Sequence, residues 1–351
     1  MLLLKRINKQ RNNFARMQSG TVLITVLLVV SFVVVLLIEV DKTVTYQSNL
    51  NRNLMNRDQA YSYLMGMEEM SKIQLKRLFD LQKDERVHLG QLWAKQEFTF
   101  PIDGGVMSAT IIDMQSCFNL NSITVADKQE TNAQVDQLNQ PDVKKNKKTI
   151  GEKIFRLLLD ELLDDRNQSI ALTASTKDWL DVDSTPSGPD GVEDHYYQGL
   201  NEPYLPPNGP IAHVSELRLV KSFNNKNYKK IRDFVCVLPN GEDYKLNVNT
   251  ITKERVDLLY AALDGKVKKS EINSVISDRP EKGYKIEEFW DKIGTDIKIN
   301  KKFKQRLDIT SRFFQLKAKA KINNTSVYMK TLLEKQQNNQ FKVVSRYFGK
   351  E

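Results

Sequence analysis

The strongest pattern in the chain is an unbroken apolar run close to its N-terminus. Residues 21–38 contain no charged side chain, are dominated by Val and Leu, and end at Glu39. At 1.5 Å per residue, a helix of this length reaches about 27 Å, close to the hydrocarbon thickness of a bilayer. The run therefore predicts a membrane-spanning helix over residues 21–40.

The helical pattern continues beyond the apolar run. Between Asp41 and Asp84 the chain has no proline and a single glycine, and apolar side chains recur at helical spacing at Leu50, Leu54, Tyr61 and Leu64. We therefore expect one long helix, embedded in a membrane in its first half and amphipathic in its second half.

Strand patterns lie on both sides of a long central region. Two β-rich runs surround the turn Asp103-Gly104-Gly105, which is typical of a hairpin. Near the C-terminus, the segment SRFFQLKAKAKI alternates between apolar and polar residues, and SVYMKTLLEK and FKVVSRYF follow after Asn-rich turns. These segments predict a three-stranded antiparallel meander with one face in water. The long helix would cover the other face, in an α+β fold.

The central region has a different character. The segments KIFRLLLDELLDD and TITKERVDLLYAAL are helical, the second opened by Thr250 or Thr252 as N-cap, whereas residues 125–148 are polar and are expected to form a mobile loop. We therefore expect a mostly α-helical insertion in the sheet domain. The division expected is a leader at 1–20, the membrane helix at 21–40, the first part of the sheet domain at 41–120, the insertion at 121–234 and 235–308, and the last strands at 309–351.

Charge and motifs argue against two large classes of function. The net charge is +9, but five of the cations precede Gly20 with no acid among them, which leaves only +4 on the rest of the chain. No segment combines clustered cations with interleaved aromatics, so we do not expect nucleic-acid binding. Zinc spacings, phosphate loops and the common nucleophile motifs are also missing from the sequence. The composition therefore offers no catalytic centre.

The junction before the apolar run has three interpretations. The five upstream cations predict a cytoplasmic N-terminus, as in an uncleaved signal anchor. A conventional cleaved signal fits poorly, because Glu39, Asp41 and Lys42 follow the run instead of small residues. The third interpretation is cleavage between Gly20 and Thr21, as in type IV pilin-like proteins, whose short basic leader ends in Gly. Most of those proteins carry Glu at the fifth mature position, where this chain has Thr25.

Several segments together resemble one family, the K-type minor pseudopilins of the type II secretion system. They extend in order over most of the chain, and the assignment to type K rests on the helical insertion, the Asn-Val-Asn-Thr segment and the missing Glu at position 25. The matching segments are SGTVLITVLLVV, RDQAYSYLMGMEE, DGGVMSATIIDMQSCFNLNSI, DWLDVD with GVEDHYY, HVSELRLV, and CVLP followed by LNVNT.

This resemblance implies a pilin-like α+β domain with a large, mostly α-helical domain inserted. It implies cleavage at Gly20/Thr21 and N-methylation of Thr21 by a prepilin peptidase, in a single-pass protein of the inner membrane whose bulk is periplasmic. It also implies a structural and non-enzymatic role in exporting folded proteins across the outer membrane, at the tip of a pseudopilus with I- and J-type minor pseudopilins.

An acidic stretch, DVDSTPSGPDGVED, is the candidate metal site. Carboxylates this dense repel one another, and a hard cation would relieve that repulsion. The stretch is no EF-hand, because Pro186 and Val192 stand where that loop needs Gly and Glu. A solvated acidic turn is the alternative, and the resemblance favours calcium. The candidate ligands are Asp181, Asp183, Asp190, Glu193 and Asp194.

The two cysteines, Cys117 and Cys236, flank the insertion, and each ends a β-rich run. If the insertion begins and ends beside one sheet, the two sulfurs can meet, and disulfides persist in the periplasm. We therefore expect a disulfide, with two buried thiols as the alternative.

Two other functions compete with the structural tip subunit. One is a minor pilin or adhesin-like tip subunit of another filament. The other is a membrane enzyme with one transmembrane helix and an external catalytic domain, for which the acidic stretch is the only candidate centre.

Overall fold

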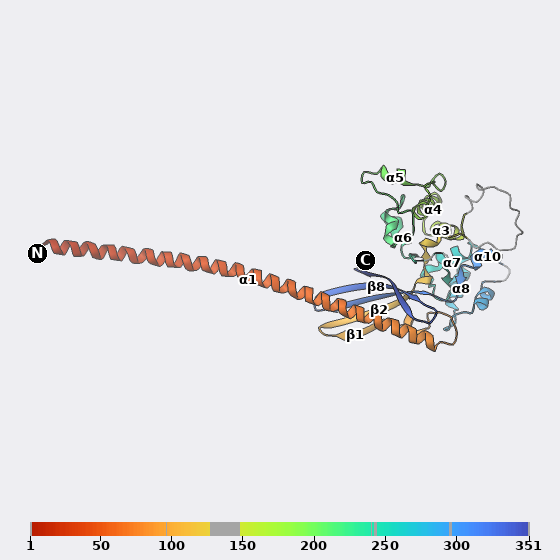
Figure 1. Ribbon diagram of the computed structural model, residues 1–351, viewed down its shortest axis with the longest axis horizontal. Coiled ribbons are helices and arrows are strands. Elements are labelled where there is room, and N and C mark those ends of the chain that lie inside the picture. The colour runs from red at the N-terminus through yellow and green to blue at the C-terminus, as the bar shows by residue number, and fades with distance from the viewer. Residues whose placement is uncertain are drawn as a thin grey trace.

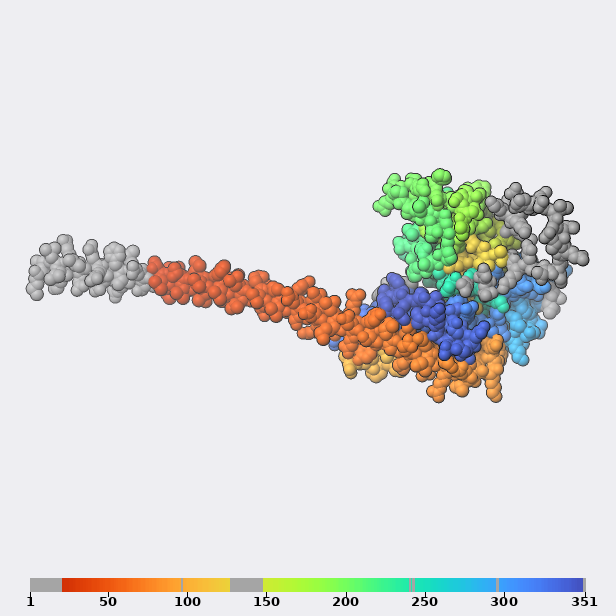
Figure 2. All heavy atoms as spheres, viewed as in Figure 1, coloured from red at the N-terminus to blue at the C-terminus, as the bar shows by residue number. Residues whose placement is uncertain are grey.

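A single long helix dominates the shape of the molecule. Side chains are described from residue 21 onward, and the computed structural model describes the backbone of residues 2–95, 97–126, 148–239, 241, 244–294 and 297–349. Helix α1 (Leu2–Leu81) is continuous over 80 residues, and its N-terminal half projects away from all other elements (Figures 1 and 2). Its apolar run is exposed and has a mean hydropathy of 3.2, so this helix is long and apolar enough to cross a membrane.

The C-terminal half of α1 packs across a sheet. Its buried side chains recur every three or four residues, which places them on one face of the helix. They are Ala60, Leu64, Met67, Glu68, Ser71, Leu75 and Phe79. The apolar members of this stripe share one core with the inner face of the sheet, and this contact holds the helix in place.

The sheet has five antiparallel strands in the order β1-β2-β7-β8-β9. The hairpin of β1 (Phe98–Ile102) and β2 (Gly105–Asp113) is followed in space by the meander of β7 (Phe313–Ile322), β8 (Thr325–Lys335) and β9 (Phe341–Phe348). Gly104 turns the hairpin with φ +74°, and a Cβ on Gly105 would lie 1.8 Å from the carbonyl oxygen of Lys321. The glycine pair is thus required both by the turn and by the close approach of β7.

Strand β7 shows the two faces of the sheet. Phe314, Leu316, Ala318, Ala320 and Ile322 are buried against α1, and the residues between them point to the opposite face. Since side chains alternate along a strand, this pattern follows directly from the sequence.

The pairing of β2 with β7 explains how a domain can be inserted here. Asp113, at the end of β2, is paired with Phe314, at the start of β7, although about 200 residues separate them. The chain therefore leaves the sheet and returns to it at neighbouring positions. The inserted elements lie at the end of the molecule opposite to the N-terminus (Figure 1).

The insertion is mostly helical and has a core of its own, separate from that of the sheet and α1. Outside the insertion, the short helix α2 (Leu92–Lys95) lies between α1 and the hairpin. The helices of the insertion are α3 (Ile150–Leu162), α4 (Arg166–Leu180), α5 (Asp194–Gln198), α6 (Asn225–Ile231), α7 (Val256–Ala262), α8 (Lys269–Ser277), α9 (Ile286–Ile293) and α10 (Lys301–Lys304). Short 3-10 helices and strands connect them: η1 (Met114–Ser116), η2 (Leu120–Ser122), η3 (Val214–Arg218), η4 (Lys253–Arg255), and the parallel pairs β3 (Phe118–Asn119) with β4 (Val235–Cys236) and β5 (Leu246–Asn247) with β6 (Leu307–Asp308).

A buried carboxylate joins the two cores. Asp113 Oδ2 accepts hydrogen bonds from Thr250 Oγ1 at 2.5 Å, Ser311 Oγ at 2.6 Å and Asn247 Nδ2 at 3.2 Å, and Oδ1 accepts one from the backbone N–H of Gln115 at 2.8 Å. Burial raises the pKa of Asp113, and these donors act against that effect. The segment LNVNT therefore supplies donors that fasten the insertion to the end of β2.

Of the two expected N-caps of the helix after LNVNT, the structure places Thr252 at the N-cap position, before η4 and α7. The hydroxyl of Thr250 is held by Asp113 instead, and Thr252 stands before η4 without a side-chain cap hydrogen bond. The expected fold class is confirmed: long helix, antiparallel sheet and helical insertion are all present. Most of the polar segment 125–148, expected to be a loop, lies outside the described residues.

Candidate functional site

The acidic stretch forms a compact cluster at the surface of the insertion. Asp178 belongs to the last turn of α4, Asp181 follows that helix directly, and Glu193 precedes α5. One carboxylate oxygen from each of the three lies within 4.8 Å of the others. The cluster is thus built from two helix ends and the loop that connects them.

Asp178 organises this loop. Its side chain is fully buried, Oδ1 accepts a hydrogen bond from the backbone N–H of Ser187 at 2.9 Å, and Oδ2 accepts one from that of Val192 at 2.6 Å. A Cβ on Gly191 would lie only 2.4 Å from Asp178 Oδ2, so the chain passes too close for a side chain there. These contacts fold the loop around the carboxylate and bring Glu193 beside the end of α4.

The cluster is electrostatically strained without a cation. Burial raises the pKa of Glu193 to about 7, and repulsion by Asp178 and Asp181 adds to the effect. Burial likewise raises the pKa of Asp181 to about 6, again with repulsion from Asp178. Among the described residues, neither side-chain oxygen of Glu193 has a hydrogen-bond partner, and nor has Asp181 Oδ1. Such a set of buried, unpartnered oxygens fits a hard cation such as calcium.

The five expected ligands divide into two sets. Asp181 and Glu193 belong to the three-carboxylate cluster, whereas Asp183, Asp190 and Asp194 are not members of it. Asp183 Oδ1 instead accepts a hydrogen bond from the backbone N–H of Thr185 at 2.9 Å. The third member, Asp178, was missed by sequence reasoning. Its spacing of three residues from Asp181, at the end of a helix, was the available signal.

Three aromatic residues come from the same helices and loop as the cluster or from the segment that follows them. Trp179 is buried, and its ring is 5.4 Å from that of Tyr197, which is 5.3 Å from that of Tyr204. Trp179 stands next to Asp178 in the sequence, which makes its indole a candidate reporter of a bound ion.

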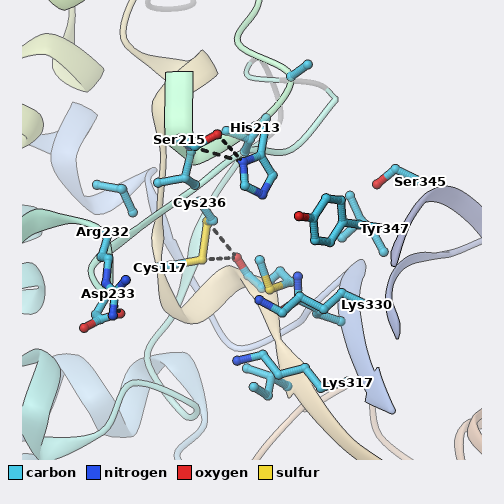
Figure 3. A pocket seen from close by; sticks show the side chains of 18 of the residues that line it. Cys117, His213, Ser215, Arg232, Asp233, Cys236, Lys317, Lys330, Ser345 and Tyr347 are labelled. Atoms are coloured by element: carbon cyan, nitrogen blue, oxygen red, sulfur yellow. Dashed lines mark hydrogen bonds and ion pairs between the residues drawn. A yellow bond between two sulfur atoms is a disulfide. The ribbon is translucent and has the colours of Figure 1, made fainter. Parts of the chain in front are cut away.

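Cys117 lies where the insertion begins, but Cys236 lies within the insertion and not at its end, because the chain returns to the sheet only at β7. Strands β3 and β4 pair in parallel, and the structure joins Cys117 to Cys236 with a Cα–Cα distance of 5.8 Å across 119 residues of sequence. Both sulfurs face the carbonyl oxygen of Met114 in a cleft beside the sheet (Figure 3). The geometry is suitable for a disulfide at the base of the insertion.

The residues of the expected processing site lie within α1. Gly20 and Thr21 are part of the uninterrupted helix, so the structure has no turn between leader and membrane segment. The hydroxyl of Thr25 donates to the carbonyl oxygen of Val22 at 2.9 Å. The hydroxyl of Thr25 therefore has a hydrogen-bond partner within its own helix.

Comparisons with known proteins agree on one family. A family model described as "Type II secretion system (T2SS), protein K" matches residues 116–240. A type II secretion system protein K from Aeromonas hydrophila is 31% identical, covering 95% of this chain and 98% of the relative. The protein K of Pectobacterium carotovorum subsp. carotovorum is 29% identical, covering 95% of this chain and 97% of its own length.

A solved structure has the same fold. In the crystal structure of the GspK-GspI-GspJ complex from enterotoxigenic Escherichia coli, a chain matches with a TM-score of 0.71 and 24% identity, covering 86% of this chain and 99% of that chain. The identity of 31% with a relative, sustained over nearly the whole length, is the stronger observation. The chain therefore belongs to the type II secretion system protein K family, the K-type minor pseudopilins.

Proposed function

We propose that this subunit caps the distal end of a periplasmic pseudopilus, with I- and J-type minor pseudopilins beneath it. The observation that carries the proposal is the position of the inserted domain. It lies at the end of the molecule away from the membrane segment, to one side of the sheet and the C-terminal part of α1, and part of it extends past the end of that helix (Figure 1). A further subunit stacked along the helix axis would meet this domain, which makes addition above it unfavourable. The E. coli structure, solved as a GspK-GspI-GspJ complex, supports the choice of partners.

The test is the position of the subunit in assembled filaments. Gold-labelled full-length chain, co-expressed with the pseudopilins and the prepilin peptidase, should appear as one label at one end of each filament. Labels that repeat along the shafts would contradict the cap. For the partners, the full chain in detergent should form a complex of defined mass with I- and J-type pseudopilins, and should not do so with the pilins of an unrelated filament.

Thr25 fits the first position in a filament. In related filaments, a Glu at this place can be buried because the N-terminal amine of a neighbouring subunit neutralises it, whereas an isolated charge in a membrane is expensive. A subunit that enters first has no such neighbour, and the hydroxyl of Thr25 is satisfied by Val22. The variant Thr25→Glu should insert less readily into the membrane bundle, and should still bind its partners through the domains outside the membrane.

Processing and topology complete the proposal. The leader would be removed between Gly20 and Thr21, and the amine of Thr21 would be methylated by the peptidase. The N-terminus would lie in the cytoplasm and the folded part in the periplasm, because the cations are concentrated before the apolar run. The intact mass of chain co-expressed with the peptidase should fall by that of residues 1–20 and rise by one methyl group. Unchanged mass would favour a signal anchor.

A calcium ion is proposed for the acidic cluster, held by Asp178, Asp181 and Glu193, with Asp183, Asp190 and Asp194 as candidates for further oxygen ligands. Its role would be structural: it would neutralise the carboxylates and lock the loop between α4 and α5. Terbium, which replaces calcium and emits when excited through a nearby indole, gives a direct test. Emission should appear on titration, disappear with excess calcium, and be lost in Trp179→Phe but kept in Trp290→Phe.

The disulfide Cys117–Cys236 is proposed for the periplasmic form. It would close the loop that holds one part of the insertion and fasten that loop beside β2. The pairing of β3 with β4 supports this, since it brings the two cysteines together independently of the sulfur chemistry.

A further inference from the structure

A short segment between α1 and α2, residues 86–90, fastens the end of the long helix to the inserted domain, and we call it the joint. The backbone N–H of Val87 donates to the carbonyl oxygen of Ile309 at 2.8 Å, and the carbonyl oxygen of Val87 accepts a hydrogen bond from Asn247 Nδ2 at 2.9 Å. Arg86 Nη1 donates to the carbonyl oxygen of Gly283, in the loop between α8 and α9, at 3.1 Å. The end of α1 is thus tied to parts of the chain that come 160 or more residues later.

His88 lies in the middle of the joint, against the loop between α8 and α9. A Cβ on Gly90 would lie 2.0 Å from the carbonyl oxygen of Glu281 and 3.0 Å from His88 Nδ1, so the imidazole and that loop close tightly around Gly90. The side chain of His88 is half-buried, and among the described residues its Nδ1 is buried without a hydrogen-bond partner. The joint therefore holds an ionisable ring with one nitrogen shielded from water.

The charges that act on this ring come from both sides of the joint. On the side of α1, the guanidinium of Arg86 pairs with Asp84 at 2.6 Å, and on the side of the insertion, Glu281 pairs with Lys95 of α2 at 2.5 Å. Burial lowers the pKa of His88, and the positive charge of Arg86 adds to this effect. Asp84, together with the backbone and carboxylate of Glu281, acts in the opposite direction without outweighing burial. The closed joint thus favours the neutral ring.

We propose that His88 makes this joint sensitive to acid, so that uptake of one proton by the ring loosens the contact between the joint and the loop between α8 and α9. An imidazolium carries an N–H at both nitrogens. The proton on Nδ1 would be buried without an acceptor, and the charge would lie near that of Arg86. Moving the ring into water removes both penalties. The proposal holds whether or not the subunit caps a filament.

Opening the joint would release the inserted domain on one side only. The domain would stay attached through the two chain connections that leave β2 and enter β7, and through the hydrogen bonds that Asp113 accepts from Thr250 and Ser311. The insertion and the sheet have separate cores, so a change at the joint need not open either of them. The proton on His88 would therefore control how firmly the insertion is held against the end of α1.

The direction of the pH dependence follows from the burial of the ring. A histidine in water has a pKa of about 6.5. Since burial lowers the pKa of His88 in the closed joint, the closed form keeps its full stability above that ordinary value and loses it as the pH falls below it. For a single proton, the ratio of open to closed joints rises by at most about tenfold between about pH 7.5 and about pH 5.5.

Backbone hydrogen exchange of the full-length chain in nanodiscs of neutral phosphatidylcholine tests the proposal. Exchange is measured at about pH 7.5 and about pH 5.5 and corrected for the intrinsic effect of pH on the amides. The N–H of Val87, bonded to Ile309, should lose protection severalfold in acid, whereas amides in the pairing of β7 with β8 should not change. In His88→Gln, whose side chain does not titrate, the joint should stay protected at both pH values. His195→Gln, at an exposed position on α5, is the control and should keep the acid response.

Unchanged protection of the joint in acid would overturn the proposal, and so would an equal loss of protection in His88→Gln. The second result would assign the response to Asp113, because burial raises the pKa of Asp113 and its carboxylate shares the amide of Asn247 with the carbonyl oxygen of Val87. If His88→Gln does not fold, hydrogen exchange at the ring Cε1 of the unaltered chain, followed by mass spectrometry over a pH series, decides the outcome. It should give His88 a titration midpoint below about 6.5, and a midpoint at or above that value would overturn the proposal.

Discussion

The carboxylate of Glu68 on α1 accepts two parallel hydrogen bonds from the guanidinium of Arg346 on β9, at 2.8 and 2.7 Å. Thr331 of β8 donates a third at 2.7 Å, and the side chain of Glu68 is fully buried. This bidentate contact lies between α1 and the last strands of the sheet, next to the mainly apolar core that the helix and the sheet share. It sets the rotation and the height of the long helix on the sheet, which apolar contacts alone define less sharply.

Removing this carboxylate should destabilise the fold. In Glu68→Gln, the charge-assisted bonds to Arg346 are lost, and we expect the free energy of unfolding to fall by about 1–3 kcal/mol. Chemical denaturation of the full chain in detergent, followed by circular dichroism, measures this. The matched control is Glu69→Gln, one residue further along α1, whose carboxylate makes an exposed ion pair with Lys72 and should matter by less than about 1 kcal/mol.

The same pair predicts a dependence on pH. Burial alone would raise the pKa of Glu68, but hydrogen bonds from Arg346 and Thr331 outweigh it and hold the pKa below its ordinary value. A carboxyl whose pKa is lowered on folding contributes stability above its unfolded pKa and loses it as the pH falls through the folded value. The stability difference between the unaltered chain and Glu68→Gln should therefore shrink in acid. A difference that stays constant down to the acid transition would contradict this.

The three-carboxylate cluster predicts which acids matter for calcium. Chelation should lower the melting temperature of the full chain, because an ion bound only to the folded state stabilises it by mass action. Asp181→Asn and Glu193→Gln should abolish this response. Glu202→Gln is the control, because this exposed acid lies beyond α5 and outside the candidate ligands, and its response to chelator should remain close to that of the unaltered chain. A chain whose melting is insensitive to chelator would favour the solvated acidic turn.

The cysteine pair predicts a reducible contribution to stability. A bridge across 119 residues contributes about 4–5 kcal/mol in the chain-entropy model, although native strain often lowers this. Cys117→Ser with Cys236→Ser should therefore melt at a lower temperature, and added reductant should lower the melting temperature of the unaltered chain alone. Two thiols that react with an alkylating reagent in the unreduced periplasmic protein would rule out the bridge.

Gly191→Ala should disturb the acidic loop more than any other small change. A Cβ there meets Asp178 Oδ2 at 2.4 Å and the backbone N of Ser187 at 2.5 Å, so the loop must open. We expect weaker terbium emission through Trp179, while Gly188→Ala, whose Cβ meets no atom within 4 Å, tests the effect of backbone strain alone at φ +88°. Equal emission from both variants and the unaltered chain would show that the loop does not hold the ion.

Periodicity in the sequence was enough to predict the architecture. The apolar run, the helical stripe after it, the Asp103-Gly104-Gly105 turn and the strict alternation in β7 each reflect a local rule, in which neighbouring side chains must face one medium or the other. Because these rules act over a few residues, the long helix, the hairpin and the meander could be predicted. The two cysteines were expected on either side of the insertion, but Cys236 lies within it, because the chain returns to the sheet only at β7.

The contacts that define the sites depend on residues far apart in the chain, and only the tertiary structure decided them. Asp178 joins the acidic cluster because the loop folds back to give it the N–H groups of Ser187 and Val192. Thr250 does not cap a helix, because its hydroxyl donates a hydrogen bond to Asp113, 137 residues earlier. Glu68 meets Arg346, 278 residues later, only when α1 packs against β9. In each case the hydrogen-bond partner of a buried polar group is far away in the sequence. Tertiary packing brings the two together, so the local sequence cannot predict which partner it will be.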